Sequence, residues 1–329
     1  MVACSCTSPV HVVGTRVQIE APLGLPAVPI PADNPPTADS IALGRKLFFD
    51  ARLSGDNTVS CATCHNPELS FTDGLPGSMG IGRKIGRRNA PTILNAAYDS
   101  TLFWDGRAPS LEQQAGFPIA NPEEMGQSHE LSIKKFEKIP EYKREFDLVF
   151  GPGRLTIGKI EMALSSFERT LVSGDSPFDR YLYRGDQSAM NEAALRGLKI
   201  FTDKKKGNCS TCHTIGEAYS LFTDGKYHNL GAGIGKNGEL TDLGRYEVTK
   251  VEDDKGAFRT PGLRNVAKTG PYMHDGSLKT LKDVVDFYDG GGSSNAHLDR
   301  EIKELKLSAR ERADLVAFLE SLTGGNGRR

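Results

Sequence analysis

Apolar residues recur every three or four positions in several separate stretches of the chain, the spacing that gives an α-helix one buried face. The first of these helices is predicted over 37–50, where Thr37 can cap the N-terminus. The same spacing predicts further helices over 129–149, 155–172, 188–202, 278–289 and 308–322. Ser308 and Glu311 form a capping-box pattern at the start of the last one. Alternating strand patterns are nearly missing, so the sequence predicts a mainly α fold.

The segments between the predicted helices are rich in glycine, of which the chain has 36. Prolines crowd residues 1–36, which predicts an extended tail or tether ahead of the first helix. Cys4 and Cys6 fall in this tail. They indicate either the remains of a lipoprotein cleavage site with a lipid anchor, or a tail that carries two thiols.

Length and charge narrow the class of protein. The 329 residues leave room for two domains of ordinary size. With a formal net charge of −1, the composition gives no support for binding nucleic acid or a membrane surface. No apolar run approaches the 18 residues that a membrane span needs.

Two copies of Cys-x-x-Cys-His carry the chemistry: Cys61, Cys64 and His65, then Cys209, Cys212 and His213. Two thiols one helical turn apart can bond the two vinyl groups of a haem, and the following imidazole can ligate its iron. A zinc site would not need the histidine both times, and a redox dithiol has no reason to occur twice. The sequence therefore predicts two covalently bound haem c groups. Because haem c is attached outside the cytoplasm, we expect an exported, periplasmic protein.

An internal repeat surrounds these motifs. Leu43-Gly44-x-x-Leu47-Phe48-x-Asp50 precedes the first motif, and Arg196-Gly197-x-x-Ile200-Phe201-x-Asp203 precedes the second. Downstream, Pro91, Asn95, Trp104-Asp105-Gly106 and Leu111 match Pro261, Asn265, His274-Asp275-Gly276 and Leu281 without a gap. We therefore predict two tandem cytochrome c-like haem domains related by a pseudo-twofold axis, over 37–175 and 176–329, with loops around the haems.

The two halves differ at the position expected beside each iron. Seven residues after Leu281 stands Tyr288, whereas seven after Leu111 stands Pro118. A phenolate can ligate iron and a proline cannot, which predicts a closed second haem (His213 and Tyr288) and an open first haem. Met273 is the rival sixth ligand, and Tyr288 as a plain core aromatic is the other alternative.

Several stretches of the chain, together covering about 35–323, resemble the bacterial diheme cytochrome c peroxidases and their MauG-type relatives. They are Leu43–Asp50, Cys61–His65, Asn89–Asn95, Phe103–Arg107, Pro118–Met125, 176–179, Arg259–Asn265 and Pro271–Gly276. The resemblance implies reduction of hydrogen peroxide at the open haem. Electrons would come through the closed haem from a small c-type cytochrome or cupredoxin. In the MauG branch the same irons oxidise residues of a partner protein.

The resemblance also assigns roles by position. Trp104 matches a tryptophan that lies between the haems and bridges electron transfer. Asn89, Thr269 and Pro271 match positions that hold a calcium ion between the domains through oxygen atoms, the ligands a hard cation prefers. A homodimer is compatible with this resemblance.

Three departures qualify these roles. Ile81 stands where many peroxidases have a histidine that blocks the open iron, which predicts a haem open without prior reduction. Tyr288 replaces the methionine of the peroxidases, as in the MauG branch. Gln113 replaces the distal carboxylate. An amide can orient peroxide but cannot accept its proton, and Glu112 should point about 100° away on a helix.

The region before the second motif bears on the partner. MauG reaches its partner through a tryptophan just ahead of this motif, where this chain has Gly207 after the run 204–206 of three lysines. This argues against a role in maturing methylamine dehydrogenase. The lysines predict either a docking patch for an acidic electron donor or a solvated loop. The leading function is therefore a diheme peroxidase. The alternatives are a MauG-like protein oxidase and a diheme electron carrier or sensor.

Overall fold

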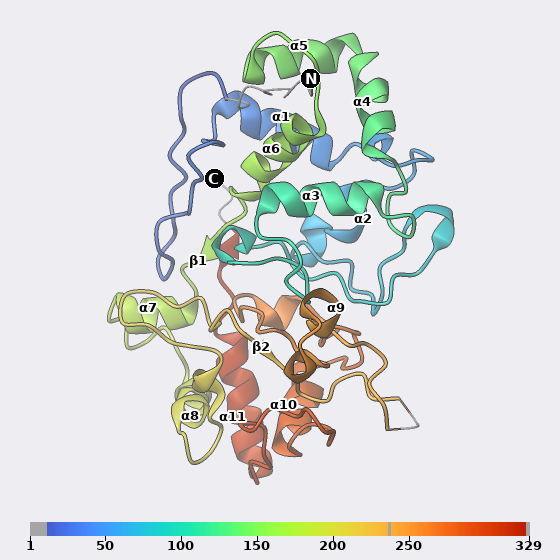
Figure 1. Ribbon diagram of the computed structural model, residues 1–329. Coiled ribbons are helices and arrows are strands. Elements are labelled where there is room, and N and C mark those ends of the chain that lie inside the picture. The colour runs from blue at the N-terminus through green and yellow to red at the C-terminus, as the bar shows by residue number, and fades with distance from the viewer. Residues whose placement is uncertain (1–11, 236–237, 327–329) are drawn as a thin grey trace.

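The structure is a computed structural model that describes residues 12–235 and 238–326 (Figure 1). Its α-helices are α1 (Ala38–Phe48), α2 (Cys61–Cys64), α3 (Leu111–Ala120), α4 (His129–Glu137), α5 (Pro140–Phe150), α6 (Ile157–Glu168), α7 (Pro177–Tyr183), α8 (Glu192–Thr202), α9 (Tyr246–Thr249), α10 (Leu281–Asp289) and α11 (Ala309–Glu320). Short 3₁₀ helices occur at Ala51–Leu53, Pro67–Leu69, Ile81–Arg83, Ala96–Tyr98, Cys209–Thr211, Glu252–Asp254 and Val266–Lys268. The prediction of a mainly α, loop-rich fold is confirmed.

The described strands have two residues each and form two antiparallel pairs. They are β1 (Ser173–Gly174) with β4 (Gly325–Asn326), and β2 (Tyr227–His228) with β3 (Phe258–Arg259). The first pair joins the segment after α6 to the segment after α11, so it connects the two halves of the repeat.

Two separate hydrophobic cores correspond to the two halves of the repeat. One is built from buried side chains between Leu43 and Phe167, and the other from buried side chains between Phe178 and Leu322. In Figure 1 the helices of the first half lie above those of the second half. The division into domains over 37–175 and 176–329 stays a prediction.

The same helix crossing builds both cores. A Cβ atom on Gly44 of α1 would lie 1.8 Å from the carbonyl oxygen of Ala163 on α6. On Gly197 of α8 it would lie 2.0 Å from the carbonyl oxygen of Asp314 on α11. Glycine is thus required at both crossings, which lets the helix before each haem motif lie directly on the last helix of its half.

Most helix predictions are close to the structure. Thr37 caps α1, with its Oγ1 accepting a hydrogen bond from the backbone N–H of Ser40 at 3.1 Å, and the capping box of Ser308 and Glu311 is present. The predicted helix 129–149 is wrong as one element. Pro140 starts a new helix after Ile139, whose extended backbone fits the restraint that proline places on its predecessor.

The N-terminal segment 12–36 has an extended course without a helix or strand, as its prolines predict, but it is packed and is not a free tether. Leu25 and Val28 are buried against Val172. Asn34 is 1% exposed and donates hydrogen bonds from Nδ2 to Glu112 at 2.7 Å and to the carbonyl of Met162 at 3.0 Å. Cys4 and Cys6 lie outside the described residues. Among the described helices, none has the length and apolar character needed to cross a bilayer.

Candidate haem sites and the interface between them

The histidine of each Cys-x-x-Cys-His motif is oriented by a backbone carbonyl. His65 Nδ1 lies 3.2 Å from the carbonyl oxygen of Phe71, and His213 Nδ1 lies 2.8 Å from that of Phe222. A carbonyl accepts only from an N–H, so Nδ1 carries the proton and Nε2 keeps its lone pair for a metal. Burial lowers the pKa of both imidazoles, which favours the neutral form that can ligate iron.

The four thiols of the motifs are not joined in disulfides. Cys61 and Cys64 belong to α2, so their Sγ atoms come from one helical turn. Cys209 and Cys212 lie in and just after a 3₁₀ turn. Both pairs are therefore free to bond the vinyl groups of a haem.

A cavity of about 290 Å³ lies at the second motif. Cys209, Cys212, His213, Tyr288 and Met273 all line it, so both candidate sixth ligands reach the same space. Much of the remaining wall is apolar, from side chains including Phe201, Leu281, Val285, Leu315 and Leu319. Among the described residues, the hydroxyl of Tyr288 has no hydrogen-bond partner, and burial raises its pKa. An apolar cavity with two thiols, an imidazole and an unpartnered phenol fits a haem.

The repeat extends from the sequence to the backbone around Pro118 and Tyr288. Leu102 bridges Ala108 in the first half as Tyr272 bridges Leu278 in the second. Helices α3 and α10 then begin at the matching residues, after the caps Ser110 and Thr280. Pro118 and Tyr288 therefore occupy equivalent turns of equivalent helices.

Trp104 lines the same cavity as His213 and Tyr288, although it belongs to the first half of the chain. Its Nε1–H donates to the carbonyl oxygen of Asn89 at 2.8 Å, and the N–H of Asn89 donates to the carbonyl oxygen of His274 at 2.7 Å. Asn89 thus links Trp104 to the second half.

The three predicted calcium ligands lie at this cavity as well. Asn89, Thr269 and Pro271 all line it. The Nδ2 group of Asn89 donates to the carbonyl of Leu75 at 2.7 Å, which leaves Oδ1 as the free oxygen of that side chain. Neutral oxygens from both halves fit a hard cation.

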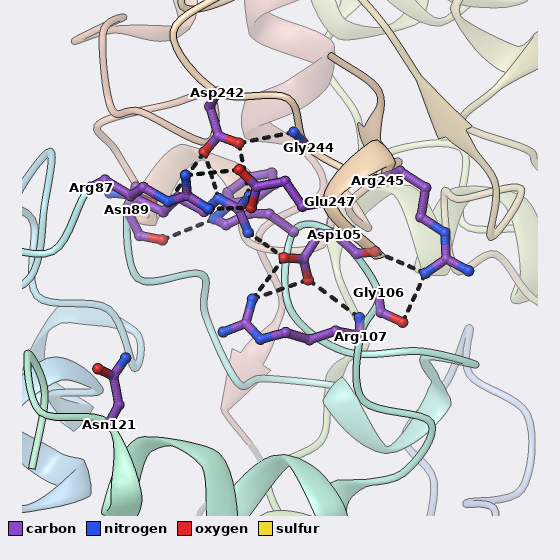
Figure 2. A network of polar contacts seen from close by, with 12 residues as sticks. Arg87, Asn89, Asp105, Gly106, Arg107, Asn121, Asp242, Gly244, Arg245 and Glu247 are labelled. Atoms are coloured by element: carbon purple, nitrogen blue, oxygen red, sulfur yellow. Dashed lines mark hydrogen bonds and ion pairs between the residues drawn. The ribbon is translucent and has the colours of Figure 1, made fainter. Parts of the chain in front are cut away.

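Arginines at the interface form a network that sequence reasoning missed (Figure 2). Arg88 donates from Nε and Nη2 to Asp242 at 2.7 and 2.8 Å, and from Nη1 to Asp105 at 2.6 Å. Burial alone would raise the pKa of Asp242, but the hydrogen bonds from Arg88 and the backbone outweigh it and lower the pKa to about 2. Arg88 therefore joins a carboxylate of each half, one of them directly after Trp104.

Glu112 is held by an ion pair and by hydrogen bonds within the first half. Its Oε1 lies 2.7 Å from Nη1 of Arg169 and accepts hydrogen bonds from Asn34 and Ser165. Burial alone would raise its pKa, but Arg169 and Asn34 outweigh burial and lower the pKa to about 2. The carboxylate of Glu112 is thus committed to Arg169, Asn34 and Ser165.

Glu124 is a carboxyl group near the first motif that sequence reasoning missed. It is half-buried, its Oε1 accepts a hydrogen bond from Asn121 at 2.8 Å, and its charge acts on the Cys64 thiol. Burial raises the pKa of Glu124, and Asn121 and Arg107 partly offset this effect. The pattern Asn121-Pro122-Glu123-Glu124 is the sequence signal that could have identified it.

The two glutamines of α3 differ in their surroundings. Gln113 is exposed, as is Phe117 one turn later, whereas Gln114 and Pro118 are both half-buried. Residues four apart share a helix face, so Gln114 lies on the face of Pro118. Gln114 is therefore a second candidate for orienting peroxide beside Gln113.

Ile81 fills the place expected for a blocking histidine. Its N–H donates to the carbonyl oxygen of Glu124 at 2.8 Å, and its Cδ1 would lie 2.2 Å from a Cβ placed on Gly126. A hydrocarbon side chain cannot ligate iron, so Ile81 itself cannot block the first site.

Cys212, Asp224 and His228 form the cluster whose ligand atoms lie within 4.8 Å of one another. His228 is held between Asp224 at 3.0 Å and Asp299 at 2.6 Å. We assign no metal to this cluster, because Cys212 is one of the two thiols that a second haem c requires.

Comparisons with known proteins show the family to which the chain belongs. The family model described as di-haem cytochrome c peroxidase matches residues 38–188. The methylamine utilization protein MauG of Methylorubrum extorquens is 44% identical over 90% of this chain and 81% of its own length. Cytochrome c551 peroxidase of Nitrosomonas europaea is 39% identical over 91% of this chain and 84% of its own. The crystal structure of a MauG-like protein associated with microbial copper homeostasis superposes with a TM-score of 0.82 at 35% identity. It covers 93% of this chain and 95% of its own.

The fold and sites define a haem-dependent oxidoreductase. The chain belongs to the di-haem cytochrome c peroxidase family, which includes the MauG proteins.

Proposed function

We propose that this protein is a periplasmic diheme c-type peroxidase with a permanently open first haem. It reduces hydrogen peroxide there with electrons that enter through the second haem from a small c-type cytochrome or cupredoxin. The observation that carries the proposal is the equivalence of Pro118 and Tyr288, since one site has a phenol that can close it and the other does not.

The bound haems would supply the redox chemistry, and the chain's residues would prepare each site for it. His65 and His213 present Nε2 because the carbonyls of Phe71 and Phe222 hold their Nδ1–H groups. Cys61 and Cys64, with Cys209 and Cys212, would hold the two haems covalently. Tyr288 would fill the sixth position of the second haem and keep peroxide away from it.

We assign proton transfer at the first site to Glu124. Cleavage of the O–O bond needs a proton moved from one peroxide oxygen to the other, which a carboxyl group can do and an amide cannot. Gln113, or Gln114 on the face of Pro118, would orient peroxide by hydrogen bonds. Pro118 has no ligating atom, so it would leave the first site open to peroxide.

Electron transfer between the sites would use Trp104, which the interface holds in place. Asn89, Thr269 and Pro271 would bind Ca²⁺ at the same cavity through neutral oxygens. The cation would tie the loops of the two halves and stabilise the position of the indole between the haems.

The electron donor would dock near the second motif. Lys204, Lys205 and Lys206 are all exposed, and Lys206 is paired with Glu311 at 2.8 Å, which leaves Lys204 and Lys205 for a partner. These two cations favour a donor with an acidic face, and Gly207 offers no aromatic contact to it. A lipid anchor at Cys4 or Cys6 would place the enzyme at the membrane surface.

A MauG-like protein oxidase is the second candidate, and Tyr288 favours it. An anionic phenolate favours ferric over ferrous iron relative to a thioether, so it should lower the potential of the second haem. Such an enzyme would hold two oxidising equivalents over both haems and use them on a protein substrate.

Stopped-flow mixing of the as-isolated ferric protein with hydrogen peroxide tests the proposal. A peroxidase should change its haem spectrum without prior reduction and return quickly to the starting spectrum when reduced cytochrome c is present. A long-lived oxidised spectrum with poor turnover of small donors would favour the protein oxidase. An unchanged spectrum would leave only the carrier or sensor and overturn both enzyme functions.

A further inference from the structure

The helix crossings define which residues of α6 and α11 are equivalent. A Cβ on Gly44 would meet Ala163 and Phe167, and a Cβ on Gly197 would meet Asp314 and Phe318 in the same way. Phe167 of α6 is therefore equivalent to Phe318 of α11, and the next residue along each helix pairs Glu168 with Leu319. A carboxyl side chain in the first half thus replaces an aliphatic one in the second.

The place of Leu319 shows what Glu168 faces. Leu315 and Leu319 lie one turn apart and both line the cavity that contains Cys209 and His213. By the repeat, Glu168 and the Leu164 one turn before it face the first haem site. The charge of Glu168 acts on the thiol of Cys61, which places the carboxyl group close to that motif independently of the repeat.

Glu168 is buried without the partners that a buried carboxylate needs. It is 6% exposed, and its Oε2 has no hydrogen-bond partner among the described residues. The adjacent Arg169 directs its guanidinium to Glu112, at 2.7 Å, so the nearest cation is already committed. An unpartnered oxygen on a wall that faces a haem site points to an interaction with the haem itself.

The surroundings favour the protonated form of Glu168. Burial raises its pKa to about 8, the charge of Glu112 on α3 adds to this effect, and Arg169 opposes it. On α2 the thiol of Cys61 is the titratable group within reach, and it becomes uncharged for good once it bonds a haem vinyl group. At neutral pH the side chain is therefore a carboxylic acid that can donate its O–H.

We propose that Glu168 is a positioning residue that contacts the first haem and exchanges one proton with solvent for each electron that this haem loses or gains. When an electron leaves the first haem, the carboxyl group releases its proton and the resulting carboxylate offsets the new positive charge. When the electron returns, the proton is taken back. The second haem has Leu319 at this place, so its potential should not depend on pH in this way.

The test is a spectroelectrochemical titration of each haem in the intact holoprotein at several pH values on both sides of 8. Exchange of one proton per electron lowers a potential by about 59 mV for each tenfold fall in proton concentration. The first haem of the wild type should approach this slope, and E168Q should lose at least half of it. Glu161→Gln, on the same helix but beside His129, is the matched control and should keep the wild-type slope.

Two further measurements keep the proposal open to refutation if E168Q folds poorly. Glu168→Leu copies the second half, so it should fold, bind both haems and flatten the first-haem slope. Infrared difference spectra of the redox change should contain a carboxylic acid C=O band that Glu168→Leu removes. An unchanged slope in Glu168→Leu, or a wild-type band that Glu168→Leu keeps, would overturn the proposal. The inference rests on the proposed function in one respect, namely that the first haem is redox-active. The potentials are measured without peroxide, so a failure of peroxide reduction would be detected in a separate experiment.

Discussion

The indole Nε1–H of Trp104 donates to the backbone carbonyl of Asn89 at 2.8 Å, and both residues line the cavity of the second haem motif. One residue therefore serves two parts of the interface, because Asn89 is also a predicted calcium ligand. The position of the aromatic bridge and the binding of the cation should depend on each other.

Replacing Trp104 by Phe should slow electron transfer between the haems while each haem keeps its normal spectrum. The smaller ring widens the gap between the sites, and the carbonyl of Asn89 loses its donor. The rate can be followed by stopped-flow reduction of one haem and absorbance changes at both. Phe103→Leu is the control, because Phe103 packs on Phe117, with the ring centroids 5.7 Å apart. Unchanged transfer in Trp104→Phe would reduce this residue to a packing role.

Removal of calcium should disturb the spectra of both haems, since the ion would tie loops of both halves at Asn89, Thr269 and Pro271. Only neutral oxygens are available, so the affinity should be modest, with a Kd on the order of 10⁻⁴–10⁻³ M. Chelation followed by titration with CaCl₂ measures both effects. No bound metal at millimolar calcium would rule out the site.

Glu124→Gln should slow the reaction with peroxide by roughly 10²–10⁴, the usual size of general acid–base catalysis. The amide keeps the shape and the contact with Asn121 but cannot carry a proton. Pre-steady-state rates with excess peroxide measure the effect. Glu123→Gln, one residue earlier and exposed, should stay near the wild-type rate. Equal rates in the two variants would show that another group moves the proton.

Gln113→Glu gives a complementary result. From sequence alone, Gln113 predicts slow activation and at least a tenfold gain on this substitution. Because the structure provides a carboxyl group at Glu124, we now expect a change of less than tenfold. A larger gain would show that proton transfer depends on the side chain at the position of Gln113.

The ion pair of Glu112 with Arg169 should stabilise the first half in a pH-dependent way. The folded-state pKa of Glu112, about 2, lies below its ordinary 4.5. The stabilisation is therefore complete above 4.5 and is lost as the pH falls toward 2. Glu112→Gln should lower the free energy of unfolding by about 2–3 kcal/mol at pH 7, measured by urea denaturation. Glu130→Gln, in an exposed pair with Lys134, should have a much smaller effect, because solvent screens that pair.

Local signals in the sequence account for much of the fold. The cap at Thr37, the capping box at Ser308 and the repeated motifs act over a few residues, so a single sequence contains them. Pro140 is also a local signal, and its restraint on Ile139 outweighed an apolar spacing that continued across it.

Features that depend on distant contacts could not be predicted in this way. The packing of Leu25 against Val172, and the pairing of Arg88 with Asp242, join residues far apart in sequence. Glu124 could not be predicted as a site residue either, because its burial beside Cys64 depends on how the loop after α3 returns to the first motif.

Electron paramagnetic resonance of the as-isolated ferric protein tests the central claim most directly. The equivalence of Pro118 and Tyr288 predicts one high-spin haem with a free position and one low-spin haem. Tyr288→Phe should convert the low-spin signal to high spin without loss of covalent haem, whereas Met273→Leu should leave it unchanged. Two low-spin signals in the wild type would contradict the open first haem and with it the proposed site of peroxide reduction.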